Sequence, residues 1–94
     1  MYAGSEVETN TIDSNFRQYT IVFNGSSSSA RRDKSAYLSD DAGTNTMNGI
    51  TLGRRNTDTG YGDPDIGEIL IYEGALDNSV RDSIEDYLAT KWGL

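Results

Sequence analysis

Oxygen-bearing side chains alternate with glycine in the stretch from Asn56 to Asp65. Carboxylates, amides and backbone carbonyls are the ligands that Ca²⁺ takes in proteins, so this loop is a candidate cation or ligand site. An EF-hand also needs a glutamate at its twelfth position, where this chain has Gly67, so that motif is excluded. The alternative is a solvated turn whose Asx side chains bond their own backbone. The candidate ligand-binding residues of the loop are Asn56, Asp58, Tyr61, Asp63 and Asp65.

The absence of histidine and cysteine removes most other site chemistry from this chain. Without cysteine there is no disulfide, thiolate nucleophile or cysteine-ligated metal, and without histidine there is no Ser-His-Asp triad. Catalysis would need a carboxylate pair, a lysine or an oxygen-ligated cation. We therefore expect no resident cofactor, with Ca²⁺ in the Asn56–Asp65 loop as the one alternative.

The composition describes one small acidic domain with few residues for a core. Ile, Leu, Val and Phe make up about 19% of the 94 residues, and the net charge is −7. Six Tyr and one Trp add apolar area. An acidic chain is a poor binder of nucleic acid, because binding to phosphates requires Lys and Arg. The longest apolar run, Ile69–Tyr72, is far too short to span a bilayer, so we expect neither nucleic acid nor membrane as a partner.

Positive charge is concentrated in the middle of the chain. Two interpretations stay open: a local basic patch, or surface charges on strands that pair with the acidic C-terminal half, which is the favoured one. The cluster consists of Arg31, Arg32, Lys34, Arg54 and Arg55.

Short strands are predicted first along the chain, and one helix last. Residues 1–15 read as an arm or edge strand, and residues 16–94 as the domain. Aromatic and β-branched residues predict a strand over Phe16–Asn24, with Tyr19, Ile21 and Phe23 on one face. Period-2 patterns predict further strands, and the apolar run near the C-terminus predicts one that is buried on both faces. These further strands are Ser29–Arg32, Ser35–Ser39, Ile50–Arg54 and Ile66–Glu73.

The last element is a predicted amphipathic helix. Asp77 is its expected N-cap, the helix runs to about Lys91, and Gly93 ends it. Its apolar stripe, expected to lie on the sheet, consists of Val80, Ile84, Tyr87, Leu88 and Lys91/Trp92.

Four polar or aromatic positions of this helix carry separate expectations. We expect Trp92 to anchor the core, and Lys91 to lay its stem on the sheet and interact with the helix C-terminus. Glu85 and Asp86 are expected on the solvated face.

Two groups of segments resemble laminin-G-like and concanavalin-A-like modules. The C-terminal group is Gly67–Tyr72, Ala75-Leu76, Arg81, Ile84, Glu85, Tyr87-Leu88 and Lys91–Leu94, and the upstream group is Tyr19–Ser28, Asp41–Asn45 and Ile50–Arg54. The resemblance covers about Phe16 to Leu94. It implies a mainly β fold: an antiparallel β-sandwich of the jelly-roll type, whole or partial, with one C-terminal α-helix. It also implies an extracellular, cell-surface or virion protein.

The sequence departs from this family in two ways. Lys34 stands where the family's two-residue turn usually carries glycine, so we expect a distorted turn or a shifted register. Such modules also have an N-terminal set of strands that this sequence lacks. Half a jelly roll leaves an inner face and sheet edges uncovered. We therefore expect a fragment or a self-associating chain, with a homo-oligomer partner or another chain completing the sandwich.

The spacing of Asp63, Asp65 and Glu68 is similar to that of the acidic residues in glucanases of the same superfamily, where one carboxylate attacks and another donates a proton. Asp63 would be one methylene too short for the nucleophile, and Pro64 removes a strand hydrogen bond. The prediction is therefore a non-enzyme.

The predicted function is a non-catalytic carbohydrate- or protein-binding module for adhesion or assembly. A purely structural self-association module is the alternative, and a glucanase remnant comes third. For a glycan, Tyr19, Tyr37 and Tyr61 could stack on sugar rings; the simpler interpretation is half-buried packing.

Overall fold

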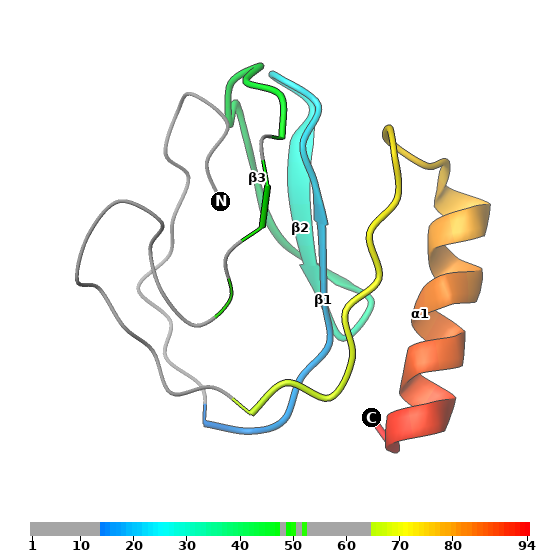
Figure 1. Cartoon of the computed structure of the whole chain (residues 1–94). Coiled ribbons are helices and arrows are strands. Elements are labelled where there is room, and N and C mark those ends of the chain that lie inside the picture. Colours follow the sequence, from blue (N-terminus) through cyan, green and yellow to red (C-terminus); the bar gives the residue numbers. More distant parts are fainter. Residues whose placement is uncertain (1–13, 48, 51, 53–64) are drawn as a thin grey trace.

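The computed structural model describes residues 14–47, 49, 50, 52 and 65–94. Three strands, β1 (Tyr19–Val22), β2 (Ser28–Arg32) and β3 (Ser35–Asp40), form one antiparallel sheet in the order β1-β2-β3. Helix α1 (Asn78–Trp92) follows as the last element and lies beside the sheet (Figure 1). The predicted antiparallel β class with a C-terminal helix is confirmed at this level. A second sheet of a sandwich is not seen in the described part of the chain.

The serine-rich turn of the first hairpin, between β1 and β2, is held by defined hydrogen bonds. Ser28 is fully buried, and its hydroxyl accepts a hydrogen bond from the Asn24 amide at 2.9 Å and donates one to the Gly25 carbonyl at 2.7 Å. Gly25 has a φ of 53°, which few other residues adopt at low cost. Ser28 is therefore the first residue of β2, one position earlier than predicted, while β1 is shorter than the predicted Phe16–Asn24.

The second hairpin turns at Asp33 and Lys34, which both have positive φ, 49° and 69°. Two positive φ values are the pattern of a type I′ turn, so the turn keeps its usual form although Lys34 replaces glycine. Asp33 ties this turn to the residues before β1: its carboxylate accepts from the Gln18 amide at 3.1 Å and pairs with Arg17 at 2.8 Å.

The expected register shift is present, but it lies in the strands and not in the turn. Arg31 pairs with Ala36 and Ala30 pairs with Leu38, so Tyr37 is the extra residue of a β-bulge. The bulge allows Tyr37 to reach the same face of the sheet as Tyr19 and Arg32, whose side chains it contacts.

Helix α1 has the predicted ends. Asp77 is the N-cap: its carboxylate accepts from the Val80 amide at 3.1 Å, and this bond holds the pKa of Asp77 below its ordinary value. Gly93 ends the helix with a left-handed φ of 68°, and the Leu94 amide donates to the Ala89 carbonyl at 2.9 Å. Both caps are local signals in the sequence, which is why the bounds were predictable.

The side of α1 that lies against the sheet is not the predicted one. Glu85, expected on the solvated face, is buried with 1% of its surface exposed, while Asp86 is exposed as predicted. Val80, Tyr87 and Trp92 of the predicted core stripe remain more than 40% exposed. Glu85 lies five positions after Val80, which places the two side chains roughly 140° apart around the helix. The helix is rotated relative to the prediction because a cation of the sheet, Arg31, draws Glu85 inward.

The apolar run near the C-terminus does not form the predicted buried strand. Residues 65–72 contain no strand, turn or bend, and the apolar residues among them are each 39–54% exposed. The predicted burial of Ile66–Glu73 on both faces is therefore wrong, although α1 lies along this segment and contacts Glu68 through Tyr87 and Trp92. Of the predicted strand Ile50–Arg54, only Ile50 and Leu52 are described, and both are exposed.

Candidate functional site

The sheet has two chemically different faces because side chains alternate along each strand. Thr20 pairs with Arg31, and Arg31 reaches α1, so these residues define the face next to the helix. We call the opposite side the sheet face; it carries Tyr19, Ile21, Ala30, Arg32, Tyr37 and Leu38.

The sheet face is largely apolar, and it is exposed mainly at β1, while Ala30 of the central strand is buried. Tyr19 and Ile21 are each about half exposed, 50% and 51%. The rings of Tyr19 and Tyr37 meet edge to face with centroids 6.0 Å apart, and the Arg32 guanidinium lies 4.7 Å from the centre of the Tyr37 ring. Edge-to-face rings and a stacked cation hold these side chains in place without burying them.

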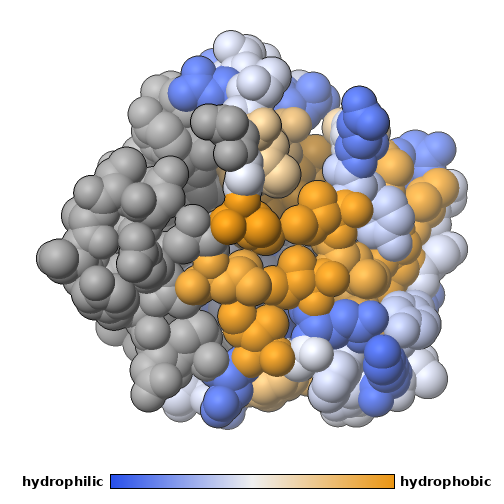
Figure 2. Space-filling model, viewed as in Figure 1, coloured by the Kyte–Doolittle hydropathy of each residue, from blue (hydrophilic) through white to orange (hydrophobic). Residues whose placement is uncertain are grey.

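Exposed apolar side chains extend well beyond the sheet face. Figure 2 shows them gathered over the middle of the molecule, in the view of Figure 1. Only Ala30 and Ala42 are buried apolar residues in the described part of the chain. The exposed large ones are Phe16, Tyr19, Ile21, Phe23, Met47, Ile50, Leu52, Ile66, Ile69, Leu70, Ile71, Tyr72, Val80, Tyr87, Trp92 and Leu94.

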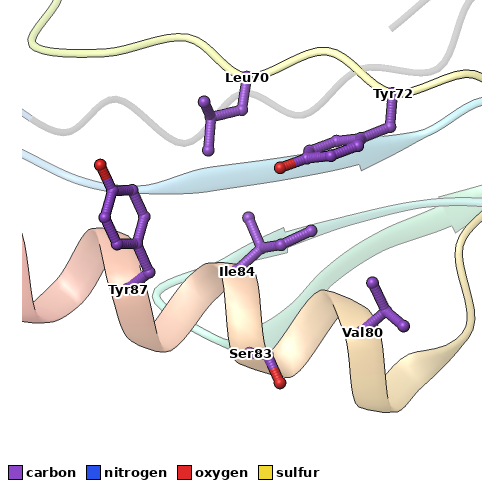
Figure 3. A pocket seen from close by; sticks show the side chains of 6 residues that line it. All are labelled: Leu70, Tyr72, Val80, Ser83, Ile84 and Tyr87. Carbon is purple, nitrogen blue, oxygen red and sulfur yellow. The ribbon is translucent and has the colours of Figure 1, made fainter.

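A second apolar surface is the open groove between residues 66–72 and α1, about 490 Å³ in volume. Figure 3 shows the side chains of Leu70 and Tyr72 on that segment and those of Val80 and Ile84 on the helix, which point toward one another. We call it the helix groove; it is lined by Leu70, Tyr72, Val80, Ser83, Ile84 and Tyr87.

Ion pairs between the sheet and α1 hold the helix in this orientation. Arg31 of β2 contacts Asp82 at 2.9 Å and the buried Glu85 at 3.1 Å. The Arg31–Glu85 contact has the distance of an ion pair without the alignment of a hydrogen bond. At the turn, Lys34 pairs with Asp86, and this hydrogen bond raises the pKa of Lys34. The favoured interpretation of the central cations, pairing with the acidic half, is confirmed for Arg31 and Lys34; Arg54 and Arg55 lie outside the described residues.

The C-terminal end of α1 is fastened through Glu68. Its carboxylate accepts from the Trp92 indole at 2.9 Å, pairs with Lys91 at 3.0 Å and accepts from the Tyr87 hydroxyl at 3.3 Å. These contacts, the Trp92 hydrogen bond first, hold the pKa of Glu68 below its ordinary value. Lys91 also donates to the Tyr87 hydroxyl at 3.0 Å, and that bond, followed by Glu68, raises the pKa of Lys91.

Trp92 is a partly exposed residue at the C-terminal end of α1 and not the predicted core residue. The indole is 41% exposed and tilts against Phe16 at 6.5 Å between ring centroids. A Cβ on Gly67 would come within 3.2 Å of the indole, so this glycine permits the close approach. The polar edge of the indole is turned to Glu68.

Most of the predicted binding loop lies outside the described residues: Asn56, Asp58, Tyr61 and Asp63. Asp65, the one described member, is exposed. No group of three or more acidic side chains in the described segments is arranged to hold a metal ion. Glu68 of the glucanase-like spacing is described, and it is engaged by Trp92, Lys91 and Tyr87.

Two residues that organise the molecule escaped the sequence prediction. Glu85 was assigned to solvent, and Arg31 was treated as a generic surface charge. A usable signal was present: Asp82 and Glu85 are three apart and lie on one side of a helix, where a single arginine can reach both.

None of the protein-family models, curated proteins or solved structures compared with the chain matches it. Within the described residues, no helix is long and apolar enough to cross a membrane.

We expect the pair Arg31–Glu85 to behave as a buried ion pair in a double-mutant cycle. Arg31→Met leaves the Glu85 carboxylate buried without its cation, so the free energy of unfolding in urea should fall by about 3 kcal/mol. Adding Glu85→Leu should recover most of that loss, since an apolar pair removes the uncompensated charge. Lys34→Met, which breaks an exposed pair, should change the stability much less. A neutral Arg31→Met variant would show that the pair does not hold the helix.

We expect an acid transition in the emission of Trp92, the only tryptophan. The pKa of Glu68 is lowered in the folded state, so its bonds stabilise the fold above the unfolded pKa and are lost as the pH falls through the folded one. The emission maximum should therefore shift as the pH falls below the ordinary pKa of a glutamate. Glu68→Gln should remove this step. An unchanged midpoint in that variant would mean that Trp92 does not report on Glu68.

Proposed function

We propose that this chain is a non-catalytic binding module for adhesion or assembly, and that its sheet face is covered by a protein layer. The observation that carries the proposal is that Tyr19 and Ile21, two large apolar residues of the sheet face, are each about half exposed. Its resemblance to laminin-G-like and concanavalin-A-like modules is in keeping with such a face, since sandwiches bury one between two sheets. The same resemblance supports an extracellular, cell-surface or virion setting.

Exposed apolar area is available on more than one surface of the chain. Six of the exposed residues are aromatic and about half open, so together they leave on the order of 600 Å² in water. This area is divided between the sheet face, which carries Tyr19, and the helix side, which carries Tyr72, Tyr87 and Trp92. Burial of the exposed part of the sheet face supplies a driving force for assembly.

The environment of Glu68 supports a binding module over a hydrolase. A glycosidase acid must hold its proton near neutral pH, which requires a raised pKa. Glu68 has a lowered pKa, and its carboxylate is occupied by Trp92 and Lys91. The contacts of Glu68 suit a structural residue that holds the C-terminal end of α1 in place.

Glycan recognition is the second candidate, and one observation favours it. The β3 bulge brings Tyr37 beside Tyr19 and Arg32 on the open sheet face. Aromatic faces next to a cationic donor fit sugar rings and acidic sugars. Binding on a glycan array that is lost in Tyr37→Ala would favour this candidate over protein assembly.

We expect the chain to self-associate through the sheet face as its concentration rises from micromolar to millimolar. Sedimentation equilibrium should show an increasing mean mass, and added salt should strengthen association because it screens the net charge of −7. Ile21→Asp places a charge at an exposed apolar position of this face and should weaken association by about tenfold or more.

The matched control is Met47→Asp, which makes the same kind of change at a residue that is 66% exposed and outside the sheet. It should leave the association constant within about twofold. A folded chain that stays monomeric at millimolar concentration would contradict the proposal, as would equal effects of the two variants.

A further inference from the structure

The segment Ile66–Tyr72 runs along α1 as a drawn-out stretch of chain (Figure 1), and its backbone has no hydrogen-bond partner among the described residues. It contains no turn or bend, no described strand pairs with it, and none of the backbone hydrogen bonds outside the regular elements involves it. An extended apolar stretch with free N–H and C=O groups is a template for an added strand. The backbone of this segment therefore has the bonding capacity for one.

The side chains of the segment suit the same purpose. Leu70 and Tyr72 line the helix groove, and they alternate with Ile69 and Ile71 at the period of a strand. All four are exposed. A strand laid alongside would find apolar side chains on both of its faces, so the pairing would bury apolar area as well as satisfy the backbone.

The helix groove adds a place for the side chains of such a strand. Its lining comes from two walls, the segment with Leu70 and Tyr72 and the helix with Val80 and Ile84 (Figure 3). In strand addition the main chain supplies affinity, and pockets for alternate side chains supply specificity. A groove of about 490 Å³ accommodates such side chains.

The charges at the two ends of the segment favour another polypeptide over a second copy in the register that pairs the whole apolar run with itself. A second copy, paired antiparallel about the centre of Leu70-Ile71, would place Glu68 of one chain opposite Glu73 of the other, and like charges in this position repel. Glu68 is already balanced by Lys91. Glu73 is exposed and has no ion-pair partner in the described part of the chain. The complementary strand therefore carries a cation opposite Glu73.

We propose that Ile66–Tyr72 accepts an extended β-strand from another polypeptide, apolar in its centre and with a Lys or Arg opposite Glu73. This inference rests on the proposed assembly function and names the partner chemistry of a second surface of the same module.

The test uses the full chain and a synthetic acetylated peptide of alternating Val and Thr with a Lys at each end. Calorimetry gives its affinity, and NMR shifts locate it at Leu70 and Tyr72. N-methylation of alternate peptide amides, which keeps the side chains but removes hydrogen-bond donors, should abolish binding. Replacing the two Lys by Glu should weaken it about threefold or more. Glu73→Lys should reverse that preference, whereas Asp40→Lys on β3, at the far edge of the sheet, should not.

Each contrary result overturns the inference. Equal binding of the N-methylated peptide would exclude strand addition, and equal binding of the Lys and Glu peptides would exclude recognition through Glu73. Shifts at Leu70 and Tyr72 that grow with protein concentration alone would make a second copy the occupant. These outcomes can be distinguished from failure of the proposed function. If Ile21→Asp abolishes self-association and no peptide binds, the proposed assembly function is supported and strand addition is excluded.

Discussion

The ion pair between Arg31 of β2 and the buried Glu85 of α1 fixes which side of the helix lies against the sheet. A carboxylate with 1% of its surface exposed is costly to bury unless a cation stays beside it, so the helix cannot rotate without breaking this contact. Asp82 shares the same guanidinium, and Lys34 holds Asp86 at the turn. The side of α1 that faces the sheet is therefore set by these ion pairs and not by the apolar stripe of the helix.

This orientation explains why so much apolar surface stays open. With Glu85 directed at the sheet, Val80 and Tyr87 lie on another side of the helix and form one wall of the helix groove. The sheet contributes little apolar contact to α1 because its near side carries Arg31. On its other side, Tyr19 and Ile21 are left in water. The Arg31–Glu85 ion pair at the helix–sheet contact is thus linked to the two surfaces that the proposals concern, the sheet face and the helix groove.

Elements specified by neighbouring residues were predictable from the sequence, while those specified by distant partners were not. Asp77 and Gly93 cap α1 through contacts within one turn, and the Asp33-Lys34 hairpin is equally local. The burial of Glu85 depends on Arg31, which is far away in the sequence, and the apolar pattern of the helix indicated the opposite side. The apolar run from Ile66 predicted burial that requires a layer which the described residues do not supply. Of the predicted binding loop, only Asp65 is described, so that site stays a prediction.

The most direct measurement is amide hydrogen exchange by NMR on the dilute, monomeric chain. The account predicts that the amides of Ile66–Tyr72 exchange close to the rate of an unstructured peptide, because no described residue accepts a hydrogen bond from them. Amides of β2 and the middle of α1 should be protected in the same sample. Protection of Ile66–Tyr72 equal to that of β2 would show that the segment is already paired within the chain, which would contradict the unpaired strand on which the proposed strand addition depends.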